Sequence, residues 1–191
     1  IDYVVVPSGS CTGAVREQHV RIAERYGSKA LADGAEQTAN KTYDLSEFIV
    51  DVAGTTDVGA FFPHRVTYHS SCHSRRFIKV GERPKELLRN VEGLELVDLP
   101  NEEECCGFGG TFAVKMPEVS AAMVSDKAMH IKETKAEYVT AGDSSCLMNI
   151  AGAMSRQHNG IRALHMAEIL ASTKEHPLTP TSAAYSKEKM L

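Results

Sequence analysis

The sequence of 191 residues contains no tryptophan, no Cys-x-x-Cys pair and no apolar run near the ~20 residues that span a bilayer. It has no segment resembling a signal peptide, so we predict a cytoplasmic protein without a membrane span. The formal net charge of −4 gives no electrostatic reason to expect a nucleic-acid partner. Motifs for a serine-hydrolase elbow, a dinucleotide-binding loop and covalent haem attachment are also absent. These absences turn attention to the cysteines.

Two of the five cysteines are adjacent and are followed by a glycine-rich turn, within the segment Glu102–Thr111. In a reducing compartment, an odd number of cysteines favours metal binding or redox chemistry over a disulfide framework. A disulfide between Cys105 and Cys106 would be strained, whereas both sulfurs suit a single soft metal or cluster. Gly107 and Gly109 allow close backbone approach and offer N–H donors to sulfur. We therefore predict a metal or cluster site at this turn.

Three other segments share one design, and they end at Cys11, Cys72 and Cys146. Each has a short β-prone run, then small polar residues, then Ser-Cys and a stretch able to form a helix. This pattern predicts a strand–turn–helix unit, with serine as the helix N-cap and cysteine near the helix N-terminus, which favours thiolate. In an open parallel sheet, ligands collect at the carboxyl edge where such turns lie.

Strands and helices are predicted to alternate along most of the chain. Helices are expected over Val15–Tyr26, Thr42–Val52, Pro84–Leu88, Pro117–Ile131, 147–157 and 166–173, and strands over 94–99, 138–141 and 161–165. The helix from Pro117 should bury Ala121, Val124, Ala128 and Ile131, whose spacing fits a 3.6-residue period. The fold class is therefore α/β, with a mostly parallel sheet, flanking helices and the cysteine site at the carboxyl edge of the strands.

Four cysteines are predicted to converge at that edge: Cys72, Cys105, Cys106 and Cys146. Four thiolates suit zinc or an iron–sulfur cluster. Ligands on separate turns favour a cluster, because structural zinc usually draws its ligands from short Cys-x-x-Cys knuckles. The alternative is that these cysteines act only as small buried hydrophobes.

The remaining polar residues near these cysteines have simpler interpretations. His69 and His73 flank Cys72 and could be ligands or proton donors, although such histidines are more often hydrogen-bonded supports or surface groups. Glu102–Glu104 is interpreted as a solvated acidic turn without a catalytic role.

With these motifs in view, the chain resembles the cysteine-rich CCG-domain family. Cys72 matches the first cysteine of a repeat, Cys105-Cys106-Gly107 the central motif, and Cys146 the first member of the closing Cys-x-x-Cys pair. Asn149 stands where the last cysteine would be. The short sequence motifs around these residues resemble those of the A-type lactate-utilisation branch of the family. That branch is related to the iron–sulfur component of glycolate oxidase and to the B-type component of heterodisulfide reductase.

The resemblance implies a chain built from two repeats. Residues 1–60 would be the remnant of a first repeat whose N-terminal part is missing, as the start at Ile1 within an apolar run also suggests. Residues 61–173 would form a complete second repeat, and 174–191 a loose tail. Cys11 would be the final cysteine of the first repeat, and so lie outside the second-repeat site.

The resemblance also implies a function. The chain would be an electron-transfer subunit that helps to oxidise L-lactate, glycolate or a similar 2-hydroxy acid, beside a ferredoxin-like iron–sulfur partner and a further subunit. A complete repeat in the heterodisulfide reductase relatives holds a non-cubane four-iron cluster on five cysteines. Because Asn149 replaces the fifth, we expect four thiolates to hold a 4Fe-4S cluster in preference to a 2Fe-2S cluster.

The supporting residues and the competing functions follow from this assignment. Gly107, Gly109 and Asn149 are predicted to contact the cofactor, with Asn149 donating either to a sulfur or to the helix backbone. The alternative function is a structural zinc-binding scaffold module. A thiol enzyme using Cys105 or Cys106 directly has the least support, because no adjacent base can be identified.

Overall fold

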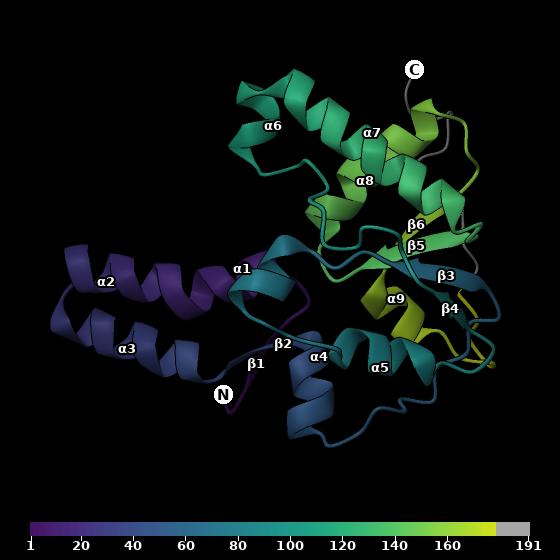
Figure 1. Cartoon of the computed structure of the whole chain (residues 1–191). Helices are drawn as coiled ribbons and strands as arrows, with labels where there is room; N and C mark the ends of the chain where they lie inside the picture. Colours follow the sequence, from purple (N-terminus) through teal and green to yellow (C-terminus); the bar gives the residue numbers. More distant parts are fainter. Residues whose placement is uncertain (179–191) are drawn as a thin grey trace.

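The computed structural model describes residues 1–178, and within them six strands form two parallel sheets (Figure 1). The strands are β1 (Val4–Val6), β2 (Thr42–Asp44), β3 (Arg65–Tyr68), β4 (Glu95–Val97), β5 (Tyr138–Ala141) and β6 (Arg162–His165). The smaller sheet pairs β1 with β2, and the larger has the order β4-β3-β5-β6. Every strand pair is parallel, which confirms the predicted α/β class.

Helical segments connect these strands. They are α1 (Gly9–Gly13), η1 (Ala14–His19), α2 (Val20–Tyr26), α3 (Lys29–Asn40), α4 (Leu45–Glu47), η2 (Phe48–Val52), η3 (His73–Phe77), α5 (Arg83–Arg89), α6 (Thr111–Lys115), α7 (Pro117–Glu133), α8 (Ser144–Arg156) and α9 (Met166–Ala171), where η marks π-helical turns. In the described residues, no helix is both long and apolar enough to cross a membrane.

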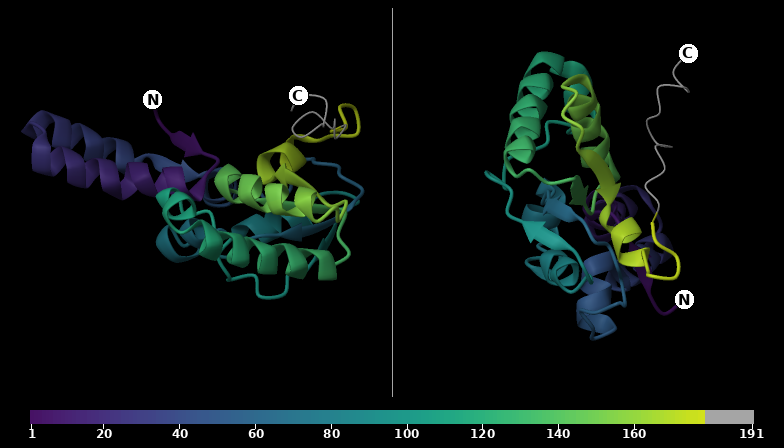
Figure 2. Two further views of the ribbon diagram at one scale, coloured as in Figure 1. Left: turned by 90° about the horizontal axis from the view of Figure 1, so that it is seen from above. Right: turned by 90° about the vertical axis from the view of Figure 1, so that its right-hand side faces the viewer.

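Helices cover both faces of the larger sheet (Figures 1 and 2). Tyr138 of β5 packs in a cluster with residues of α5 and α9, on one face. Its neighbour Val139 packs with residues of α7 and α8, on the other. Successive side chains of a strand point to opposite faces, so β5 contributes to two separate cores. The second core contains Cys106 and Cys146, and the candidate site therefore lies at the end of a hydrophobic layer.

One predicted element was wrong in part. Thr42–Val52 was expected to be a single helix, but Thr42–Asp44 is strand β2 and pairs with β1. The helix begins only at Leu45, because Asp44 and Glu47 form a reciprocal capping box. The backbone of Asp44 is extended in this arrangement and can therefore end a strand.

The predicted buried face of α7 was wrong at Ala121, which is exposed. Val124, Ala128 and Ile131 are buried as predicted, but Ser120 is buried in place of Ala121. The Ser120 hydroxyl donates to the Gly107 carbonyl oxygen at 2.7 Å. This hydrogen bond turns the first part of α7 toward the glycine-rich turn, which a count of apolar residues could not indicate.

The N-terminal part of the chain includes a helical hairpin that extends away from the larger sheet (Figure 2). Its two arms are η1 with α2, and α3, which had not been distinguished as a separate helix. The boundaries of the proposed repeats, 1–60 and 61–173, stay a prediction. Of the proposed tail, residues 179–191 lie outside the described residues, while the Leu178 N–H donates to the Ser172 hydroxyl.

Candidate metal centre

The four candidate cysteines follow three neighbouring strands of the larger sheet. Cys72 comes after β3, Cys105 and Cys106 come after β4, and Cys146 comes after β5. Because β4, β3 and β5 are adjacent and parallel, their carboxyl ends lie at the same edge. The order of the strands thus brings together cysteines that are far apart in the sequence.

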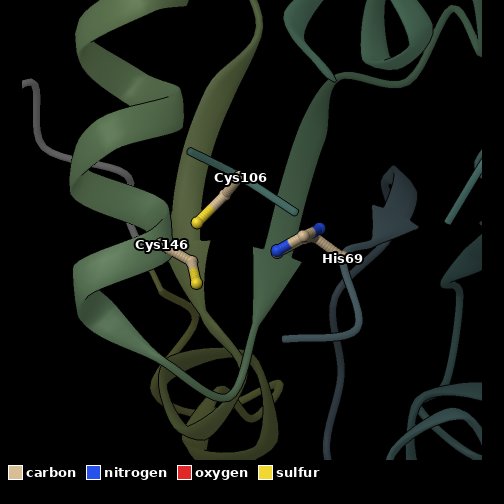
Figure 3. Close-up of side chains that lie close together, drawn as sticks. All are labelled: His69, Cys106 and Cys146. Atoms are coloured by element: carbon tan, nitrogen blue, oxygen red, sulfur yellow. The ribbon is translucent and has the colours of Figure 1, made fainter. Parts of the chain in front are cut away.

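Three side chains at this edge point toward one another: His69, Cys106 and Cys146 (Figure 3). The sulfur atoms and an imidazole nitrogen all lie within 4.8 Å of one another. The three residues are 1%, 2% and 6% exposed, respectively. A thiol pair and an imidazole at this separation are a donor set suited to zinc or iron.

Cys72 and Cys105 extend this group of thiols, and both are only partly exposed. Burial, and then the neighbouring Cys105 thiol, raise the pKa of Cys72. Interaction with the Cys106 thiol, together with burial, raises the pKa of Cys105. The four thiols therefore form a chain of interacting neighbours. Their assignment as one ligand set stays a prediction.

Cys106 interacts with a cysteine on each side. Its contact with Cys105 lowers the pKa of Cys106, but contact with Cys146 and burial outweigh this and raise it to about 12. Without a metal, this thiol is therefore protonated at neutral pH. Since a metal binds thiolate, metal binding must release protons from this cluster.

Gly107 shapes the turn that carries the adjacent cysteines. Its φ is +79°, and a Cβ atom there would lie 2.6 Å from the Ser120 carbonyl oxygen of α7. Glycine is therefore required both by backbone conformation and by close packing. The Gly107 N–H donates to the Cys105 sulfur at 3.4 Å. Gly109 also has a positive φ, +55°, and precedes the start of α6.

Asn149 lies one helical turn beyond Cys146 in α8, and its amide donates to the Cys106 carbonyl oxygen at 2.8 Å. The bond therefore reaches a backbone group, but one in the glycine-rich turn and not in the first turn of α8. It holds that turn against α8 and helps to place Cys106 beside Cys146. A contact between Asn149 and a bound cofactor stays a prediction.

The segment before the adjacent cysteines is attached to the surrounding helices. Glu102 forms an ion pair with Lys85 of α5, and both side chains are largely buried. The Lys127 ammonium group of α7 donates to the Asn101 carbonyl oxygen at 2.7 Å. Glu102 is thus not part of a solvated acidic turn, as its sequence context had suggested. It fixes the loop that delivers the two cysteines.

Asp143 caps the helix that carries Cys146, a role that the sequence pattern had given to serine. One carboxylate oxygen accepts from the Ser145 N–H at 3.3 Å, and the other from the Ser10 N–H at 3.1 Å. The second bond reaches α1, the helix of Cys11. Burial opposes the charge of Asp143, but hydrogen bonds from Ser145 and Ser10 outweigh it and lower its pKa.

Cys11 differs from the other cysteines in its surroundings. It lies in α1, whose N-cap is Ser8, and its side chain is exposed. It is not among the three residues whose ligand atoms converge. Cys11 and Cys146 share one local sequence pattern, but the family resemblance already predicted that Cys11 lies outside the second-repeat site.

His69 was given little weight as a ligand from the sequence, yet it belongs to the converging group. It follows β3 directly, and its backbone N–H donates to the Thr140 carbonyl oxygen of β5 at 2.8 Å. Burial lowers the pKa of its imidazole to about 3, so the ring is neutral at physiological pH. A neutral imidazole is the form that binds metals. The only indication of this role in the sequence was that His69 directly follows a strand whose residues are mostly buried.

A sequence model of the CCG cysteine-rich domain family matches residues 66–151, the segment that contains all four candidate cysteines, so the site lies in a cysteine-rich domain. The relatives are more specific. The chain is 47% identical over 174 residues to Lactate utilization protein A of Oceanobacillus iheyensis, covering 91% of this chain and 70% of that protein. It is 50% identical over 171 residues to the protein of the same name from Geobacillus sp. strain WCH70, covering 90% and 71%. The corresponding Bacillus subtilis protein is 44% identical over 171 residues, covering 90% and 71%. The chain belongs to the Lactate utilization protein A family.

Proposed function

We propose that this chain is an iron–sulfur electron-transfer subunit of a complex that oxidises L-lactate or a closely related 2-hydroxy acid such as glycolate. The observation that carries the proposal is the placement of the four cysteines on the turns after β3, β4 and β5, at one edge of one sheet. The proposed ligands are Cys72, Cys105, Cys106 and Cys146. Membership of the Lactate utilization protein A family supports the substrate class.

The donor set favours an iron–sulfur cluster. Thiolates are the usual protein ligands of such clusters, and their supply from separate turns gives the spacing that a group of several atoms needs. We prefer a 4Fe-4S to a 2Fe-2S cluster. Oxidation of lactate to pyruvate removes two electrons and two protons, and a cluster would carry those electrons onward one at a time.

The residues of the chain would act on the cluster by fixing and shielding its ligands. Cys106 and Cys146 lie within a hydrophobic layer, so water is largely excluded from that side. The Gly107 N–H already points to the Cys105 sulfur, and such a donor stabilises a thiolate. Asn149 keeps the glycine-rich turn on α8 and so holds Cys106 in place. These contacts would tune a reduction potential through hydrogen bonding and burial.

We assign the chemistry of the substrate carbon to a partner. The sequence has no nicotinamide, flavin or substrate-carboxylate motif, so hydride removal is not placed on this chain. We propose a cytoplasmic assembly with a ferredoxin-like iron–sulfur subunit, which would take electrons from this chain or supply them, and a further subunit.

A second candidate function is a structural zinc module. The observation that favours it is the close approach of His69, Cys106 and Cys146, because three ligands of one ion lie close together. In that case, the chain would act as a scaffold within the complex, and electron transfer would take place in its partners.

Metal analysis of anaerobically prepared protein distinguishes the two functions. The proposed function requires iron and acid-labile sulfide in similar amounts, broad visible absorbance, and an EPR signal after reduction. Stoichiometric zinc without colour would favour the scaffold. A lactate-dependent change in the EPR signal, measured with the partner subunits present, would connect the cluster to the substrate.

A further inference from the structure

The imidazole of His69 is the one part of the converging group that has no structural explanation. Its side chain is 1% exposed, and neither ring nitrogen has a hydrogen-bond partner among the described residues. An unpaired polar group that is buried in a protein destabilises the folded state. Buried histidines in folded proteins are therefore normally hydrogen-bonded or bound to a metal.

The residues around His69 could hold a metal ion, and the imidazole would bind this ion in place of a hydrogen-bond partner. A nitrogen of the ring and the sulfurs of Cys106 and Cys146 lie within 4.8 Å of one another. For a tetrahedral ion with metal–sulfur bonds of ~2.3 Å and metal–nitrogen bonds of ~2.0–2.1 Å, ligand atoms lie about 3.6–3.8 Å apart. The three side chains would need to close by only about 1 Å to share one ion.

We propose that His69 is a nitrogen ligand of the metal centre that Cys106 and Cys146 bind. The inference rests on the metal site of the proposed function and changes its ligand set. In a 4Fe-4S cluster each iron has three sulfides and one protein ligand, so His69 would hold an iron in place of one of the four proposed thiolates. In a zinc site, His69, Cys106 and Cys146 would share one ion. Replacing thiolate by imidazole raises the reduction potential of an iron–sulfur centre, because the neutral ligand stabilises the added electron better.

The neighbouring His73 shows what a histidine outside the group looks like. It is exposed, and its Nδ1 atom lies 3.6 Å from the Cys72 sulfur, on the partly exposed side of the site. It can be hydrated, so its position needs no metal. His73 therefore serves as a matched control for His69.

Pulsed EPR on the reconstituted protein tests the proposal. The protein is loaded anaerobically with ferrous iron and sulfide, and its histidines are labelled with 15N. We expect the hyperfine coupling of a directly bound nitrogen in the wild type and in His73→Gln, and its loss in His69→Leu. A cluster whose spectrum shows no such coupling in the wild type would overturn the ligand assignment and leave the proposed function intact.

A protein that binds zinc in place of a cluster would separate the two claims in the other direction. The proposed function would then fail, and X-ray absorption at the zinc edge would test His69. A nitrogen scatterer near 2.0–2.1 Å that disappears in His69→Leu would support the ligand assignment. A shell containing only sulfur in both proteins would overturn it.

The melting temperatures of the metal-free and metal-loaded proteins test the role of His69 independently. His69→Leu removes two unpaired nitrogens from an apolar layer, so we expect the metal-free variant to melt no lower than the metal-free wild type. The rise in melting temperature on metal loading should be smaller in the variant than in the wild type or in His73→Gln. A variant that is destabilised without metal but gains as much from metal as the wild type would show a purely structural role.

Discussion

The two sheets of this protein use the same local design but differ in what they bury. Residues 1–52 and 61–173 both contain strand–turn–helix units with a cysteine at the start of the helix. In the described residues, Ala23 is the only buried hydrophobic residue of the first segment, whereas all buried members of the two hydrophobic clusters except Ala60 lie in the second. The buried residues of the first segment are otherwise mainly polar, such as Thr12, Asp44 and Ser46.

The difference shows that a repeated motif does not by itself make a site. In the first segment, Ile22 and Tyr26 of the helical hairpin are 56% and 75% exposed, and Cys11 is exposed as well. In the second, α7 and α8 cover the sheet, and the same cysteine position is buried beside another thiol. Cys146 differs from Cys11 in its burial and in its neighbouring thiol, although both cysteines follow a serine.

The largest expected difference between the two segments is in metal binding. Cys106→Ser should weaken metal binding by more than the ~10–100-fold that loss of a supporting group costs, because it removes a proposed ligand. Cys11→Ser should leave the metal content unchanged. Iron and sulfide, or zinc, are measured per chain after identical loading. Equal loss of metal in both variants would mean that Cys11 belongs to the same site.

The junction between the segments should also be important for stability, through Asp143. Asp143→Ala removes the cap of α8 and leaves the Ser10 N–H without its partner. We expect a loss of roughly 2–4 kcal/mol in the free energy of unfolding, from the lost cap and the unsatisfied donor. Urea unfolding followed by circular dichroism measures it. Ser28→Ala, which removes the cap of α3 in the hairpin only, should cost about 1 kcal/mol.

This prediction has a definite dependence on pH. The pKa of Asp143 is lowered in the folded protein, so its charged form stabilises the fold. That contribution is present above the ordinary carboxyl pKa of about 3.9 and is lost as pH falls through the lower folded value. The difference between wild type and Asp143→Ala should therefore be constant near neutral pH and shrink in acid. A difference that grows in acid would contradict the role given to the carboxylate.

A smaller effect is expected where α1 packs on η3. A Cβ atom at Gly9 would lie 2.9 Å from the Ser74 backbone nitrogen and would also clash with the Ser74 hydroxyl. Gly9→Ala should therefore separate the two segments slightly and cost roughly 1–3 kcal/mol in unfolding free energy. Gly34→Ala in α3, where a Cβ meets nothing within 4 Å, should instead stabilise by about 0.5–1 kcal/mol. If both changes had the same sign, the close packing at Gly9 would not be the cause.

Much of the fold could be predicted from local patterns. The strand of Tyr138–Ala141 is β-branched and aromatic in part, and the helix from Pro117 begins at a residue suited to its first turn. The strand Thr42–Asp44 could not be predicted in this way, because three residues show no periodicity and their partner β1 lies far away in the sequence. The Asp44 and Glu47 capping box was the local signal for the true start of the helix.

The position of the cysteines at one edge of the sheet could be predicted from the sequence, but the contacts that support them could not. Cys105-Cys106-Gly107 is a distinctive motif. The other cysteines follow predicted strands, which placed them at the same edge of a parallel sheet. The roles of His69 and Ser120 depend on which side chains surround them after folding. A sequence shows that a histidine follows a strand, but not that both of its nitrogens are buried without partners.

The smallest effect is expected at Asn149, a position at which the segments after Cys146 and Cys11 differ. Three residues after Cys146 is Asn149, whose amide holds the Cys106 carbonyl, whereas three residues after Cys11 is Ala14. Asn149→Ala gives the segment after Cys146 the same residue that the segment after Cys11 has at this position. It should lower the free energy of unfolding by about 1 kcal/mol, the typical net contribution of one hydrogen bond.

Asn149→Asp removes the same donor and adds a negative charge facing the Cys106 carbonyl oxygen, so its cost should be larger than that of Asn149→Ala. The charge should also lower the reduction potential of a cluster at this site, because it disfavours the added electron, while Asn149→Ala should change the potential less. Urea unfolding of the metal-free variants and redox titration of the loaded ones measure the two effects separately. Unchanged stability in both variants would show that the hydrogen bond does not hold the turn. A potential that is unchanged in a fully loaded Asn149→Asp protein would show that the cluster does not lie beside residue 149, because a charge close to a cluster must alter the energy of the reduced state. Asn149 would then be left with only its contact to the Cys106 carbonyl oxygen.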